Sequence, residues 1–219
     1  MFNSALKRKL QSQDAEIIKH QGLVNALDRS MAIVELGLDG KVIRANDNFL
    51  RIMGYRAEQI LGVAHSDLCP TALVRSSAYN EFWGRLRAGE FVSGTFQRVG
   101  ADGRKVWLEA SYSPVLDEQG KVCKVVKFAL DVTQKVLQDA EANSKLNALD
   151  RAMAVIEFDL NGNILQANQN FLNTMGYAQT DLKGKHHRMF CEADLVGSSE
   201  YTDFWKRLNS GEVFSGQFK

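Results

Sequence analysis

The chain carries one long pattern twice, and the second copy follows the first by 122 positions. The segment Asn25–Arg29 recurs as Asn147–Arg151, and Met53–Tyr55 recurs as Met175–Tyr177. The register holds without a gap to the last residue, with about half of the positions identical, far more than shared composition produces. Further matches are Ala45-Asn46 with Ala167-Asn168, Asn48–Leu50 with Asn170–Leu172, Phe82-Trp83 with Phe204-Trp205, and Gly89-Glu90 with Gly211-Glu212. A period this long indicates two duplicated domains rather than a solenoid.

Length and composition favour ordinary folded domains. The 219 residues leave room for one or two domains that each bury a core. The apolar share of 45% and the charged share of 24% are typical of such domains. Because the net charge is only +1, nucleic acid and acidic membrane surfaces are poor candidate partners.

The sequence also bears on the compartment. No apolar run is long enough for a membrane helix, and the first residues do not resemble a signal peptide. The cysteines Cys69, Cys123 and Cys191 include no Cys-x-x-Cys pair, which fits a reducing environment. We therefore expect a cytoplasmic protein with no membrane contact.

Residues 1–27 are predicted to form an amphipathic helix with a thin apolar seam at Leu10, Ile17 and Val24. Two alternatives stay open for this seam. The helix could lie on its own domain, or it could form a short coiled-coil contact in a homodimer.

The first copy, residues 28–133, predicts an α+β domain. Two strands are expected at 31–38 and 41–45, joined by a two-residue hairpin turn at Asp39-Gly40. Short helices follow, the last over 76–88, and three more strands complete the order at 94–99, 105–116 and 121–130. The prediction is a five-stranded antiparallel sheet with short helices on one face.

The two copies are joined by residues 134–149, which predict a stiff helix rather than a flexible tether. The second copy, residues 150–219, ends just after the counterpart of Phe96 and has no counterpart of the last two strands. A sheet missing these strands would expose apolar surface and an unpaired edge. We expect either a fragment of a longer chain, which is the favoured explanation, or a gap filled by another molecule.

Several short motifs carry a resemblance to a known family. They are Asp39-Gly40, Ala45-Asn46, Phe49-Leu50, Met53-Gly54-Tyr55, Gly62, Phe82-Trp83, Gly89-Glu90, the runs Trp107–Val115 and Lys124–Phe128, and Asp131-Val132-Thr133. With these motifs the chain resembles tandem PAS domains. It is most similar to the sensory front end of bacterial methyl-accepting chemotaxis transducers of the soluble energy-taxis and biofilm-dispersion type.

The resemblance implies a sensory module in which a sheet and its helices enclose a pocket. Asp131 and Thr133 occupy the family's closing Asp-x-Thr motif, which couples the sheet to the exit helix. The resemblance also implies a downstream signalling domain, outside this sequence, that contacts a chemotaxis histidine kinase through an adaptor. PAS domains bind haem, flavin or small metabolites, or bind nothing, so the fold alone leaves the ligand open.

Two pairs of repeated aromatic side chains are candidate cofactor contacts. His65 and His187 could ligate a haem iron, as in haem-binding relatives, or could be surface or capping histidines. Trp83 and Trp205 could stack on the flavin of FAD, or could be ordinary core aromatics. The stretch 64–70 departs from the basic-His-Pro-Asp pattern of flavin-binding relatives.

Asn46 and Asn168 could donate hydrogen bonds to a ligand, but a helix N-cap explains them without one and is favoured. Cys69 and Cys191 lack the Asn-Cys-Arg context of flavin photoreceptors, and are expected to be small buried apolar residues.

No catalytic or metal-binding signature appears, and the repeated Glu35 and Glu157 lie on a predicted strand without an evident partner. We therefore expect no enzyme. The favoured function is a signal-transduction sensor that detects a small ligand or a redox state, and the alternative is a ligand-free PAS module for dimerisation or docking.

Overall fold

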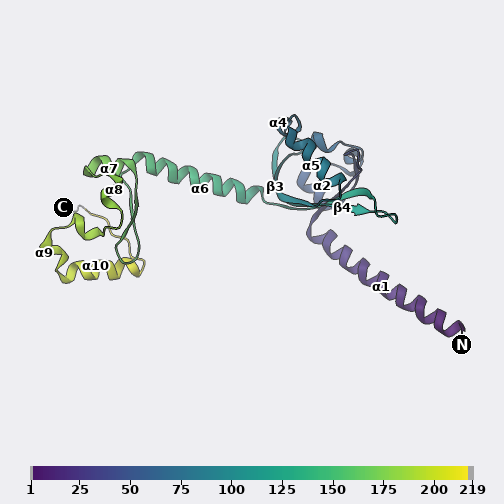
Figure 1. The fold of residues 1–219 in the computed structure, drawn as a ribbon, viewed down its shortest axis with the longest axis horizontal. Coiled ribbons are helices and arrows are strands. Elements are labelled where there is room, and N and C mark those ends of the chain that lie inside the picture. Colours follow the sequence, from purple (N-terminus) through teal and green to yellow (C-terminus); the bar gives the residue numbers. More distant parts are fainter. Residues whose placement is uncertain (1, 217–219) are drawn as a thin grey trace. The chain divides into compact units, whose positions relative to one another are not determined.

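The computed structural model describes residues 2–216, with side chains from Gln13 to Gly216. The chain divides into two compact units, Met1–Gln138 and Asp139–Lys219 (Figure 1). No helix of the described residues is both long and apolar enough to cross a membrane.

The first unit is built on an antiparallel sheet with the order β2-β1-β5-β4-β3. Short helices gather on one side of this sheet (Figure 1). The strands are β1 (Ala32–Leu36), β2 (Val42–Ala45), β3 (Val92–Val99), β4 (Lys105–Leu116) and β5 (Val122–Asp131). The helices after β2 are α2 (Asp47–Met53), α3 (Ala57–Ile60), the 3-10 turn η1 (His65–Leu68), α4 (Thr71–Val74) and α5 (Ser77–Arg87). The predicted five-stranded α+β fold is confirmed.

Alternation along the strands places the core of the first unit. In β4 the side chains of Val106, Leu108, Ala110 and Tyr112 are buried, as the period of two predicts. Phe49 and Met53 of α2 and Trp83 and Leu86 of α5 pack against the same face. The core therefore lies between the inner face of the sheet and these two helices.

The predicted two-residue turn at Asp39-Gly40 is wrong. The amide of Gly37 donates to the carbonyl of Lys41 at 2.8 Å, and the amide of Gly40 donates to the carbonyl of Gly37 at 2.9 Å. Leu38, Asp39 and Gly40 thus form a three-residue loop, and Gly40 has a φ of +80°. A type I turn followed by a left-handed glycine produces this loop length.

Helix α1 (Phe2–Ser30) precedes the sheet and extends beyond the predicted bound of residue 27. Ile17 and Val24 of the expected seam are exposed, whereas Leu10 lies outside the described side chains. The alternative in which this seam lies on its own domain is therefore wrong for the described side chains. The coiled-coil alternative stays a prediction.

Helix α6 (Thr133–Ala152) contains the predicted connector 134–149 and leads from the first unit into the second. The second unit has a two-stranded sheet, β6 (Ile156–Phe158) and β7 (Ile164–Ala167), in the described residues. Ile164, Leu172 and Leu182 form its small buried core. Its helices are α7 (Gln169–Met175), α8 (Gln179–Leu182), η2 (His187–Phe190), α9 (Ala193–Val196) and α10 (Ser199–Asn209).

Candidate functional site

Asn46 joins three segments of the first unit. Its side-chain oxygen accepts hydrogen bonds from the amides of Phe49 and Ile33, both at 2.9 Å. Its side-chain nitrogen donates to the carbonyls of Asp28 at 2.9 Å and Met31 at 2.8 Å. The N-cap prediction therefore describes half of its role, because the same side chain also binds the end of α1 and the start of β1.

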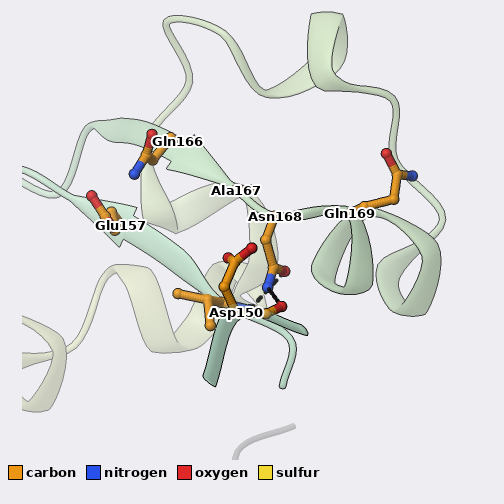
Figure 2. Close-up of a pocket in the computed structure, with 7 residues that line it drawn as sticks. Asp150, Glu157, Gln166, Ala167, Asn168 and Gln169 are labelled. Atoms are coloured by element: carbon orange, nitrogen blue, oxygen red, sulfur yellow. Dashed lines mark hydrogen bonds between the residues drawn. The ribbon is translucent and has the colours of Figure 1, made fainter. Parts of the chain in front are cut away.

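Asn168 repeats this arrangement in the second unit. Its oxygen accepts from the amides of Phe171 and Val155, both at 2.9 Å, and its nitrogen donates to the carbonyls of Asp150 and Met153, both at 2.7 Å. Figure 2 shows Asn168 turned toward Asp150, at the end of α6. Both asparagines thus fix the last turn of an incoming helix to the edge of a sheet.

Ion pairs strengthen the first junction. Arg44 of β2 contacts Asp28 of α1 at 3.3 Å and Glu35 of β1 at 3.2 Å, and Lys124 of β5 contacts Glu35 at 2.6 Å. Burial would raise the pKa of Glu35, but the hydrogen bonds from Lys124 and Arg44 lower it. Glu35 therefore has two partners that the sequence analysis did not identify.

The second copy replaces the arginine of this junction. Gln166 occupies the position of Arg44, and it lines a cavity of about 380 Å³ together with Asp150, Glu157 and Asn168 (Figure 2). The counterparts of three of the paired residues, Asp28, Glu35 and Arg44, thus line an open cavity.

The Asp-x-Thr motif fixes the start of α6 to the sheet. The amide of Thr133 donates to the Asp131 carboxylate, and the Thr133 hydroxyl oxygen accepts from the amide of Trp107, both at 2.9 Å. The amide of Val132 donates to the carbonyl of Trp107 at 2.9 Å. Strand β4 is therefore hydrogen-bonded to the residues from which α6 emerges.

His65 lies in the interior of the first unit, with only 3% of its surface exposed. Its Nδ1 lies 3.1 Å from the hydroxyl of Tyr79, and its Nε2 lies 3.2 Å from the hydroxyl of Tyr112. The sulfur of Cys69 lies 3.7 Å from Nδ1. The surface or capping alternative for His65 is therefore wrong, because η1 turns this side chain inward.

Aromatic rings enclose His65. Its centroid lies 5.5 to 5.7 Å from the rings of Tyr79, Phe82, Trp83 and Tyr112. An iron ligand needs a free nitrogen, whereas both nitrogens of His65 contact tyrosine hydroxyls. The first unit in this conformation therefore does not fit a haem at His65, and Trp83 is buried among the same rings rather than open to a flavin.

Two cationic side chains reach the same interior. Arg98 of β3 and Lys127 of β5 are each 2% exposed. Arg98 donates to the hydroxyl of Tyr112 at 2.8 Å and to the carbonyl of Gln97 at 2.7 Å, but its Nε has no partner among the described residues. Burial, followed by the charges of Arg98 and Lys127, holds the pKa of His65 well below 6.5. The interior of the first unit is thus electropositive.

The sequence did not indicate to us that Arg98 and Lys127 are interior residues. The period of two along β5 could have found Lys127, because it lies between the inward positions Val125 and Ala129. Strand β3 begins with several exposed residues in a row, so it shows no regular alternation that would mark Arg98 as inward.

In the second unit His187 is half-buried and lies 3.1 Å from the hydroxyl of Tyr201 and 3.5 Å from the sulfur of Cys191. It lines a cavity of about 670 Å³ with Phe190, Phe204 and Phe214. Trp205 does not line this cavity, although it lies against His187. In the first unit Tyr112 of β4 packs against His65 on the corresponding face, and the second copy in this sequence has no counterpart of β4. The cavity at His187 is therefore an uncovered inner face and does not by itself indicate a ligand.

Titration of His65 gives a testable consequence. The folded chain favours the neutral form of His65, whose pKa is well below 6.5. The contribution of His65 to the free energy of unfolding is therefore fully present above the unfolded pKa of about 6.5 and is lost as the pH falls below that value. The expected slope from this group is about 1.4 kcal/mol per pH unit. Urea denaturation between about pH 7 and 5 should show a slope that is one proton steeper in the wild type than in His65→Gln. Equal slopes would contradict a neutral His65.

Comparisons with known proteins agree with the fold. Residues 42–129 match a family model described as PAS fold, and residues 150–218 match one described as PAS domain. The chain is 52% identical over 194 residues to the biofilm dispersion protein BdlA of Pseudomonas aeruginosa, covering 89% of this chain and 46% of that protein. It therefore spans less than half the length of this relative.

Two more distant similarities were found. A bacterioopsin transcriptional activator of Halobacterium salinarum is 27% identical over 112 residues, which cover 51% of this chain and 16% of that protein. A crystal structure of a PAS domain from Colwellia psychrerythraea is 23% identical with a TM-score of 0.47, covering 54% of this chain and 98% of that chain.

Proposed function

Since the chain belongs to the PAS-domain family and carries two PAS domains in tandem, we propose that it is the sensory region of a cytoplasmic chemotaxis-type transducer. The first domain, residues 28–133, binds a small ligand or responds to a redox state. The change then passes through the connector 134–149 to the second domain, residues 150–219, in which this sequence has no counterpart of the last two strands. The role is one of binding rather than catalysis.

One observation carries this proposal, namely that side chains of both domains hold the ends of the helices. Thr133 binds the amide of Trp107 where α6 begins, and Asn168 binds the carbonyl of Asp150 where α6 ends. A change in the packing of a sheet can therefore shift the population of two helix positions. Asp131 and Thr133 are the proposed signal-coupling residues.

The proposed partners follow from the relative. BdlA is named a biofilm dispersion protein, and we place this chain in the same kind of signalling. The transducer would act as a homodimer and reach a chemotaxis kinase through an adaptor, by way of a downstream domain.

The function is tested with a chimera in which this chain replaces the matched region of BdlA. The chimera is expected to restore biofilm dispersion to a strain that lacks BdlA. Thr133→Val, which keeps the shape of the side chain and removes the hydrogen bond to Trp107, is expected to reduce the response about fivefold or more. A folded chimera that gives no dispersion would contradict the proposal, as would a Thr133→Val chimera that responds fully.

A second function has one observation in its favour. Four aromatic rings pack around His65, and a closely packed core of this kind is expected of a ligand-free dimerisation module. This function predicts a dimer whose response does not depend on any small molecule.

A further inference from the structure

The interior of the first unit holds two basic side chains and, among the described residues, no carboxylate that pairs with them. Arg98 and Lys127 are both almost wholly buried, and neither forms an ion pair with a carboxylate among the described residues. A buried cation without a paired anion is costly, so such groups in proteins are usually paired or hold a ligand.

Arg98 presents an incomplete set of hydrogen bonds. Its Nη1 donates to the carbonyl of Gln97, and its Nη2 donates to the hydroxyl of Tyr112. Its Nε has no partner among the described residues. Nε and Nη2 form one edge of the guanidinium group, and two parallel N–H groups on such an edge match the two oxygens of a carboxylate.

Lys127 of β5 approaches the same place from the other side of β4. It pairs with Tyr112 in the β4–β5 register, and its Nζ lies 5.0 Å from the centre of the Tyr112 ring. The guanidinium carbon of Arg98 lies 6.0 Å from the same ring. Burial, followed by the charge of Arg98, holds the pKa of Lys127 well below 10.5, as expected for an ammonium group that lacks an anion.

The surroundings of the two cations are aromatic. Phe49 lies 5.9 Å from Nζ of Lys127, and Phe96 lies 5.0 Å from the guanidinium carbon of Arg98. Phe82 packs edge-on against Tyr112 at 4.9 Å. Rings of this kind match an apolar ligand body, whereas the cations match an acidic head group.

We propose that the first domain binds a small organic carboxylate with an apolar body, whose carboxylate contacts Arg98 and Lys127. One carboxylate oxygen accepts a hydrogen bond from Nε of Arg98. The other accepts from Nη2 and replaces the Tyr112 hydroxyl there. Displacement of this hydroxyl also frees Nε2 of His65, so binding rearranges the aromatic cluster. This inference rests on the proposed sensor function and names the ligand class for it.

The test titrates the full chain with benzoate, and with benzamide as the matched neutral probe, by calorimetry. Benzoate is expected to bind at least about tenfold more tightly than benzamide. Arg98→Met and Lys127→Met should each weaken benzoate binding about tenfold or more, whereas the exposed cation variant Arg85→Met should leave it unchanged. Circular dichroism checks that each variant is folded.

Inorganic phosphate separates a carboxylate site from a general anion site. Phosphate that binds as tightly as benzoate, with the same dependence on Arg98, would overturn the assignment to an organic acid. Equal affinity for benzoate and benzamide, or no benzoate binding at all, would overturn the inference, and a buried water would then be the partner of Arg98 Nε.

Native mass spectrometry of the purified chain distinguishes a failure of the carboxylate assignment from a failure of the proposed sensor function. A bound neutral molecule would overturn the carboxylate assignment and leave the sensor function intact. A bound organic acid that is lost in Arg98→Met would support the inference directly.

Discussion

Asn46→Ala is expected to lower the free energy of unfolding of the first domain by about 3 kcal/mol. The change removes a buried helix cap and leaves the amides of Ile33 and Phe49 without their acceptor. It also removes the donors to the carbonyls of Asp28 and Met31. Urea denaturation followed by the fluorescence of Trp83 and Trp107, in a Trp205→Phe background, measures the loss.

Asn48→Ala is the matched control for this prediction. Asn48 donates to the carbonyls of Asp28, Arg29 and Met31, but it holds no buried amide of the sheet. Its loss should cost only about 1 kcal/mol. Equal losses in the two variants would show that Asn46 does not join the helix to the sheet in the way described.

Lys127→Met is expected to change stability in the opposite direction, raising the free energy of unfolding by about 1–4 kcal/mol near neutral pH in the absence of ligand. The folded chain disfavours a charged Lys127, whereas the unfolded chain is protonated up to about pH 10.4. The wild type should therefore gain stability as the pH rises toward this value, and the variant should lack this gain.

Lys124→Met is the control for Lys127→Met. Lys124 lies on the same strand but pairs with Glu35, so its removal should lower stability slightly rather than raise it. Denaturation of both variants between about pH 7 and 10 measures the difference. A Lys127→Met protein that is less stable than the wild type would mean that the buried ammonium group has a partner in the folded chain.

The sequence predicted the features that depend on local pattern. The period of two along β4 predicts that Val106, Leu108, Ala110 and Tyr112 share one face, and the burial of all four agrees with it. The repeated Asn46 and Asn168 were predicted as caps, because an asparagine before an apolar helical pattern satisfies free backbone amides.

The candidate site was harder to predict because it forms from distant parts of the chain. His65, Arg98 and Lys127 lie on three segments, and only the curved sheet and η1 bring them around Tyr112. A lone histidine and the single cation Arg98 carry no local signal of burial, whereas the period of two along β5 does mark Lys127 as inward. The predicted turn at Asp39-Gly40 was wrong for a different reason, because an Asp-Gly dipeptide occurs in hairpin loops of two residues and also of three.

In the proposed sensor, the interior of the first domain is coupled to the start of α6. Hydrogen exchange of the full chain, compared between wild type and Tyr112→Phe, tests this coupling without any ligand. Tyr112→Phe removes the hydroxyl that contacts Arg98 and His65, and Arg85→Met serves as the surface control.

Tyr112→Phe is expected to accelerate exchange at the amides of Trp107 and of the first turn of α6 by about fivefold or more, while Arg85→Met does not. Faster exchange confined to the amides around His65, with Trp107 and α6 unchanged, would contradict the coupling.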